Sequence, residues 1–136
     1  MEIIEKQKQK IAEIAEKYGL RLVLLFGSRV SGRLNKESDF DVAYLPSKKL
    51  SFDDEIQVNY EFTNIFQHDR VDTVDLKKAP PLLAEGISRE HQILFCQDME
   101  VYYLYKIYAF KKFIEAKPLF RLREALIDKY FLTHKI

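Results

Sequence analysis

The feature that most constrains the fold is the run "LRLVLLF" (20–26), which is almost wholly apolar and stands between Gly19 and Gly27-Ser28. A run this short is typical of a strand rather than a helix, and a strand that is covered on both faces is apolar along its whole length. The run therefore predicts a buried β-strand that helices must cover.

Other segments predict the elements around this strand. "DFDVAYL" (39–45) and the alternating "RVDTVDL" (70–76) are typical of strands, and "HQILF" (91–95) of a short edge strand. Helices are expected over 2–18, from a cap at Ser51 to about Gln67, from Pro80-Pro81 to about Ser88, and in two pieces on either side of Pro118. This order favours an α/β (α+β) fold, a small mixed sheet flanked by helices with further C-terminal helices. We expect a single domain over 1–136, with a core of about 1–97 and a helical extension of about 98–136.

Composition narrows the class of protein. The formal net charge of +1 argues against a general nucleic-acid coat protein, although residues 101–136 carry eight Lys or Arg against three acidic residues. The N-terminus lacks the apolar core of a secretory signal, and no apolar stretch is long enough to cross a membrane. The single cysteine, Cys96, lies in an apolar context and suits a reducing cytoplasm.

Two aspartates stand one residue apart at the start of the second predicted strand. Side chains alternate along a strand, so Asp39 and Asp41 share one face while Phe40 and Val42 turn to the core. Carboxylates this close repel each other unless a cation lies between them. Paired metal ions stand about 3.5–4 Å apart, a gap that such carboxylates can bridge, so a two-metal Mg²⁺ site is predicted here.

The turn before these aspartates suits a phosphate. If Ser28 begins a helical turn, its hydroxyl and the free N–H groups after it can hold phosphate oxygens, and Gly27 lets the backbone come close. Arg29 either adds a charge-assisted contact or is simply solvated. Arg33 and Lys36 lie in the following loop, where they could reach a triphosphate, although loops commonly carry such charges. Ser38 suits a turn-stabilising role. A phosphate cradle beside paired carboxylates is the arrangement of nucleotidyl transfer.

A third carboxylate is expected on a neighbouring strand to activate the attacking hydroxyl. "RVDTVDL" contains two aspartates on opposite faces, Asp72 and Asp75. Strand geometry alone leaves the choice between them open.

Gly27-Ser28, ten residues and then Asp39-Phe40-Asp41 resemble the GS-x10-DxD signature of the DNA polymerase β-like nucleotidyltransferase superfamily. "RVDTVDL" is similar to its strand with the third carboxylate, and this resemblance selects Asp72. The chain's short length and the "GSRVSG" turn resemble the minimal nucleotidyltransferases, MntA-type antitoxins that are paired with all-helical HEPN toxins. The resemblance implies transfer of AMP from ATP to a tyrosine of such a toxin, with two Mg²⁺ ions on Asp39, Asp41 and Asp72, and Gly27, Ser28 and Arg29 at the nucleotide.

Two other functions stay open at this point. One is an antitoxin that neutralises its partner by binding alone, and the other is a nucleotidyltransferase acting on a small molecule such as an aminoglycoside. The segment "VYYLYKIYAFKKF" (101–113) has apolar residues around more than one helix face. That surplus predicts a second apolar surface, for a protein partner or a homodimer, and RNA binding is the less favoured alternative.

Overall fold

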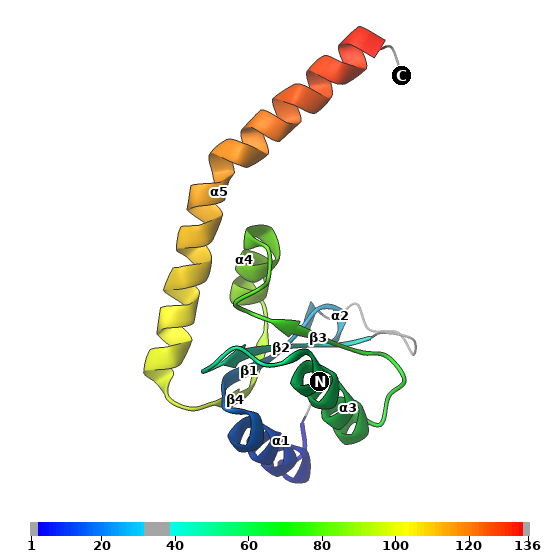
Figure 1. Ribbon diagram of the computed structural model, residues 1–136, viewed down its shortest axis with the longest axis vertical. Helices are drawn as coiled ribbons and strands as arrows, with labels where there is room; N and C mark the ends of the chain where they lie inside the picture. The colour runs from blue at the N-terminus through cyan, green and yellow to red at the C-terminus, as the bar shows by residue number, and fades with distance from the viewer. Residues whose placement is uncertain (1–2, 32–38, 135–136) are drawn as a thin grey trace.

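The computed structural model describes residues 3–31 and 39–134 (Figure 1). Its elements are, in chain order, α1 (Glu5–Tyr18), β1 (Leu20–Phe26), α2 (Ser28–Ser31), β2 (Phe40–Pro46), α3 (Phe52–Phe66), β3 (Val71–Asp75), α4 (Pro81–Arg89), β4 (Gln92–Cys96) and α5 (Met99–His134). The predicted strands and the helices before residue 90 are confirmed to within a few residues. Ser51 caps α3 as expected, since its hydroxyl accepts a hydrogen bond from the backbone N–H of Asp54 at 3.1 Å.

The four strands form one mixed sheet in the order β3-β2-β1-β4. β1 pairs antiparallel with both β2 and β4, whereas β2 and β3 run parallel. A parallel pair needs a crossover connection, and α3 provides it. The predicted small mixed sheet is therefore confirmed, with the apolar β1 in its interior and Leu22 to Leu25 fully buried.

Helices cover both faces of the sheet (Figure 1). One core packs α1 and α3 against alternate residues of the strands, among them Val23, Val42 and Phe62. The opposite core packs α4 and the first part of α5 against the other set, and Leu24 and Ile87 are fully buried there. Side chains alternate along a strand, so the core to which one residue belongs shows on which face of the sheet its polar neighbours lie.

The expectation of two C-terminal helices separated at Pro118 is wrong. α5 is a single helix of 36 residues with Pro118 in its interior. Proline removes one backbone hydrogen bond and its ring crowds the preceding turn, which bends a helix without having to end it. Figure 1 shows α5 changing direction part-way along its length.

The two parts of α5 differ in their surroundings. Val101, Tyr105 and Ala109 belong to the core, and the Tyr105 hydroxyl donates a buried hydrogen bond to the Ala84 carbonyl at 2.9 Å. Beyond Pro118 the helix extends away from the sheet (Figure 1), and its apolar side chains are exposed. Within the described part of the chain, no helix combines the length and apolar character needed to cross a bilayer.

Candidate active site

The candidate site lies at the end of the sheet where β1 finishes and β2 and β3 begin. Phe40 and Val42 of β2 turn into the core under α1 and α3. Because side chains alternate along a strand, Asp41 turns to the opposite face, the face that α4 and α5 cover. In the sheet register Asp41 stands between Phe26 of β1 and Asp72 of β3. The strand pairing thus brings together two aspartates that are far apart in the sequence.

Negative charge is crowded at Asp41. Partial burial, and then the charges of Asp72 and Asp39, raise the pKa of the Asp41 carboxyl above its ordinary value of 3.8. On Asp39, Oδ1 is buried without a hydrogen-bond partner among the described residues and lies 3.9 Å from Nη1 of Arg70. The ion pair with Arg70 that balances this negative charge is long and partly exposed.

The Gly27 turn lies directly against the Asp41 carboxylate. Gly27 has φ +82°, and a Cβ added to it would stand 2.2 Å from Oδ2 of Asp41. A side chain at Gly27 would thus be strained by the backbone conformation and would also collide with the carboxylate. Ser28 then begins α2, and the Val30 N–H donates to the Gly27 carbonyl at 3.0 Å. The expected helical turn at Ser28 is present, beside the aspartates.

The structure separates Asp72 from Asp75. Asp72 is in register with Asp41, while Asp75 is in register with Tyr44, whose side chain belongs to the core under α1 and α3. Asp75 is buried, and its Oδ1 accepts a hydrogen bond from the Lys77 N–H at 2.8 Å. The geometry agrees with the choice of Asp72. Asp75 thus stabilises the turn after β3.

The guanidinium carbon of Arg29 lies 4.0 Å from the centre of the Phe40 ring, a cation–π contact. Phe40 belongs to the core under α1 and α3 and stands between Asp39 and Asp41 in the sequence. Arg33, Lys36 and Ser38 lie outside the described residues.

The donor set fits a hard divalent cation. Within residues 3–31 and 39–134, no three His, Cys, Asp or Glu side chains are close enough to form a ready-made cation site. Asp39, Asp41 and Asp72 nevertheless supply the carboxylate oxygens that such cations prefer. A divalent ion among them would relieve the repulsion that raises the pKa of Asp41.

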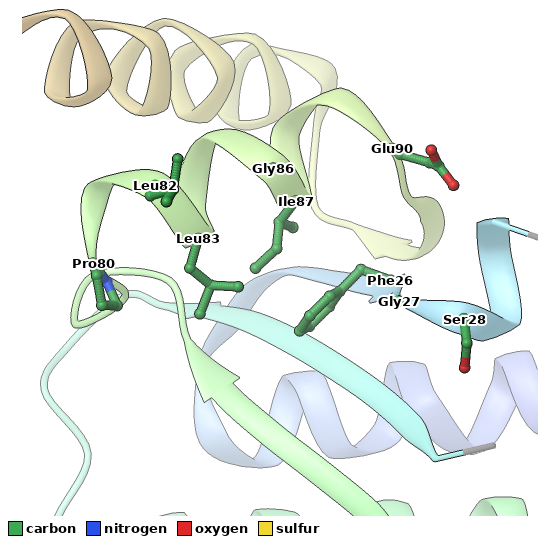
Figure 2. A pocket seen from close by; sticks show the side chains of 9 residues that line it. All are labelled: Phe26, Gly27, Ser28, Pro80, Leu82, Leu83, Gly86, Ile87 and Glu90. Carbon is green, nitrogen blue, oxygen red and sulfur yellow. The ribbon is translucent and has the colours of Figure 1, made fainter. Parts of the chain in front are cut away.

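A cavity of about 740 Å³ opens beside this turn (Figure 2). Phe26, Gly27 and Ser28 form one wall, and α4 with Pro80 before it forms the other. The residues of the α4 wall belong to no motif, and the sequence predicted no function for them. The one indication in the sequence was Gly86, an isolated glycine inside a helical pattern. Arg70 was also missed, although it begins the "RVD" segment.

The family of the chain follows from sequence comparison. The family described as "Polymerase beta, Nucleotidyltransferase" matches residues 9–100, which is more than half of the chain. The chain belongs to the polymerase beta nucleotidyltransferase family. No curated protein matches it in sequence.

Solved structures show the same nucleotidyltransferase fold. A toxin–antitoxin crystal structure with AMP-PNP has 24% identity and a TM-score of 0.73, covering 91% of this chain and 98% of that one. A tri-AMPylated Shewanella oneidensis HEPN toxin in complex with MNT antitoxin has 22% identity and a TM-score of 0.68, and the match covers 93% of this chain and 98% of that one. Spectinomycin adenyltransferase from Enterococcus faecialis, with ATP and spectinomycin, has 14% identity and a TM-score of 0.51, and the match covers 74% of this chain and 59% of that one. The expected nucleotidyltransferase fold is confirmed.

Proposed function

We propose that this nucleotidyltransferase transfers AMP from ATP to a tyrosine hydroxyl of a helical HEPN toxin and so acts as its antitoxin. The observation that carries the proposal is the position of Asp41, paired in register with Asp72 and pressed against the backbone of Gly27. Structures of toxin–antitoxin complexes, one with AMP-PNP and one with an AMPylated toxin, cover nearly the whole chain and support this choice of acceptor. The free thiol of Cys96 suits a reaction in the cytoplasm.

Asp39, Asp41 and Asp72 hold two Mg²⁺ ions in this proposal. When bound, the ions neutralise charge on the phosphates and lower the pKa of the attacking hydroxyl. The Ser28 hydroxyl and the backbone N–H groups that follow Gly27 bind the β- and γ-phosphates. Arg29, whose guanidinium stacks on the Phe40 ring, adds a charge-assisted contact to the phosphates in this proposal.

The transfer is an in-line displacement at the α-phosphorus. The acceptor oxygen forms a bond to phosphorus while the bond to the bridging oxygen of the β-phosphate breaks. Asp72 receives the hydroxyl proton, AMP becomes attached to the acceptor, and pyrophosphate leaves. Positioning and charge neutralisation supply most of the rate enhancement.

The far part of α5 supports a helical protein partner. Its exposed apolar side chains line a groove of about 550 Å³, formed by Leu119, Leu122, Leu126, Ile127, Tyr130 and Phe131 together with the stem of Arg123. These side chains recur at helical spacing and form a stripe along one side, which suits packing against another helix. The predicted apolar surplus over 101–113 is present as well, and its exposed side chains are Tyr103, Leu104, Ile107, Tyr108 and Phe110. The exposed apolar surface of α5 thus lies on both sides of Pro118.

Labelled ATP tests the proposed chemistry. The protein is incubated with Mg²⁺, the toxin of the neighbouring reading frame, and ATP labelled either at the α- or at the γ-phosphate. We expect the toxin to acquire the α-label only, and to lose ribonuclease activity as it does so. Transfer of the γ-label would mean phosphorylation and would refute the proposal.

Asp72→Asn tests the proposed base, and Asp75→Asn is its matched control on the same strand. Asp72→Asn should lower AMP transfer by a factor of at least about 10² because it removes a group that accepts the proton. Asp75→Asn keeps an oxygen that can accept the Lys77 N–H bond, so it should retain transfer. Equal losses in the two variants would contradict the assignment.

Neutralisation of the toxin by binding alone is the second candidate function. The exposed apolar side chains of α5 beyond Pro118 favour it, because they offer a surface for a protein partner. An Asp39→Asn/Asp41→Asn double variant separates the two functions, because it removes the charge of the site and leaves α5 intact. Under the enzymatic proposal this variant binds the toxin without silencing its ribonuclease activity. Full neutralisation by the double variant would establish the binding function instead.

A further inference from the structure

Arg70 stands beside Asp39 in the way that Asp72 stands beside Asp41. In the parallel pairing of β2 with β3, Asp41 is in register with Asp72. Continuing that register by two residues, to the position just before each strand, pairs Asp39 with Arg70, and Nη1 of Arg70 lies 3.9 Å from Oδ1 of Asp39. Because residues two apart share a face of the sheet, the arginine and the three aspartates form one cluster.

The backbone of Arg70 is fixed on both sides, whereas its side chain is not. The Arg70 carbonyl accepts a hydrogen bond from the Phe40 N–H at 2.9 Å, and the Arg70 N–H donates to Nδ1 of His68 at 3.0 Å. The His68 ring packs edge-on against the Phe40 ring, with 5.1 Å between the ring centres. The side chain of Arg70 is 63% exposed, so it can leave Asp39 without disturbing these contacts.

Asp39 has an oxygen atom that no donor satisfies. Its Oδ1 is buried, and no hydrogen bond reaches it from the part of the chain that the structure describes. A separation of 3.9 Å is too long for a hydrogen bond, so Arg70 offers this oxygen a nearby charge and no bond. A divalent cation such as Mg²⁺ prefers carboxylate oxygens as direct ligands. Mg²⁺ and the Arg70 guanidinium therefore compete for the same carboxylate.

We propose that Arg70 is a counter-ion that competes with Mg²⁺ for Asp39 and so weakens the binding of free metal. The inference rests on the proposed function, which places Mg²⁺ on Asp39. A metal ion that arrives alone has to displace the guanidinium, and the two cations repel each other. A nucleoside triphosphate supplies further oxygen ligands and negative charge, so metal that arrives with it overcomes the competition more easily. Arg70 thereby couples the loading of metal to the presence of nucleotide.

A purely structural ion pair would behave differently. The Arg70 and Asp39 side chains are 63% and 39% exposed, and exposed pairs contribute little to folding stability. A structural role predicts that removing Arg70 lowers stability and leaves metal binding unchanged or weaker. The competition predicts the opposite sign for the metal, because the three carboxylates then bind Mg²⁺ without an opposing charge.

Calorimetric titration of the full chain with Mg²⁺, without nucleotide and at low ionic strength, measures the competition. Arg70→Gln should lower the half-saturating Mg²⁺ concentration about threefold. Arg70→Lys keeps the charge and should stay close to the wild type. Arg21→Gln is the matched control, because Arg21 is exposed at the far end of β1, where its Nε donates to the Gln97 side chain, and it should leave the Mg²⁺ affinity unchanged. With saturating AMP-PNP, the difference between Arg70→Gln and the wild type should fall below about twofold.

A double-mutant cycle shows whether the effect passes through Asp39. In an Asp39→Asn background, Arg70→Gln should no longer tighten Mg²⁺ binding, because the oxygen for which the two cations compete has lost its charge. The same gain in both backgrounds would overturn the inference.

The remaining outcomes separate this inference from the proposed function. Equal or weaker Mg²⁺ binding by Arg70→Gln would overturn the competition, and if the wild type still transfers the α-label of ATP, the proposed function stands. A gain in Arg70→Gln that persists undiminished with AMP-PNP would overturn the coupling to nucleotide. If the wild type binds no Mg²⁺ with or without AMP-PNP, the proposed metal role fails and this inference fails with it.

Discussion

Asp41→Asn should make the protein more stable at neutral pH while abolishing AMP transfer. The folded chain holds the Asp41 proton more tightly than the unfolded chain, because burial and the charges of Asp72 and Asp39 raise its pKa above 3.8. Stability therefore falls as the pH rises from about 3.8 through the raised pKa of the folded state, and the full penalty applies above that pKa. Asparagine has no proton to lose in this range, so the variant escapes the penalty.

The size of the effect follows from the strand pairing. Neighbouring strands lie about 4.8 Å apart, and two unit charges at that separation repel by about 0.9 kcal/mol in water and about 3.5 kcal/mol at an effective dielectric constant of 20. Asp41 is partly exposed, so a gain near the lower figure, about 1 kcal/mol, is expected. For a chain of this length that gain corresponds to a rise in melting temperature of about 3–5 °C.

Thermal unfolding at a series of pH values measures this gain. The difference between Asp41→Asn and the wild type should be near zero below pH 3.5 and grow as the pH rises above about 4. At pH 7, millimolar Mg²⁺ should raise the melting temperature of the wild type but not of the variant. A variant that is less stable than the wild type at pH 7, or equally more stable at every pH, would refute the argument that charge is crowded at Asp41.

Three further substitutions, one of them with a matched control, test separate parts of the structure. Gly27→Ala should abolish AMP-PNP binding in a titration, because its Cβ would collide with the Asp41 carboxylate. Gly19→Ala is the control, since Gly19 has a similar positive φ of +67° and lies far from the site. It should lower stability but keep AMP-PNP binding. Tyr105→Phe should lower the free energy of unfolding in urea by about 1 kcal/mol, because the buried Ala84 carbonyl loses its donor. Pro118→Ala should straighten α5, which would increase the maximum dimension in small-angle X-ray scattering and weaken toxin binding.

Local patterns were enough to predict most of the sheet and the pair at Asp39 and Asp41. The run 20–26 is apolar because both of its faces are covered, so its burial is visible in the sequence itself. The position of Asp72 beside Asp41 is different in kind. The two aspartates are neighbours because of the register between β2 and β3, which α3 connects. The periodicity of a single strand does not predict its register with another strand. Resemblance to a family supplied that choice, and the register agrees with it.

Contacts made only in the folded chain account for what the sequence did not predict. Arg29 stacks on the Phe40 ring, a contact that no spacing rule reveals. Pro118 was expected to end a helix, yet a proline inside a helix can also bend it, and flanking residues that favour helix decide between the two. Gly86 was passed over because a glycine without a positive φ or a close contact has no local signature beyond its helix propensity.

The parallel pairing of β2 with β3 also sets the order in which the site can be assembled. β1 and β2 are neighbours in the chain and can form a hairpin early, which brings Gly27 to Asp41. Asp72 follows Asp41 by thirty-one residues, and it arrives only after α3 has closed the crossover. A nascent chain that has folded only its first hairpin thus has the turn and the paired aspartates without the third carboxylate. Catalysis is gained only with this pairing of β2 and β3, so activity reports that the crossover has closed, which helix content does not report.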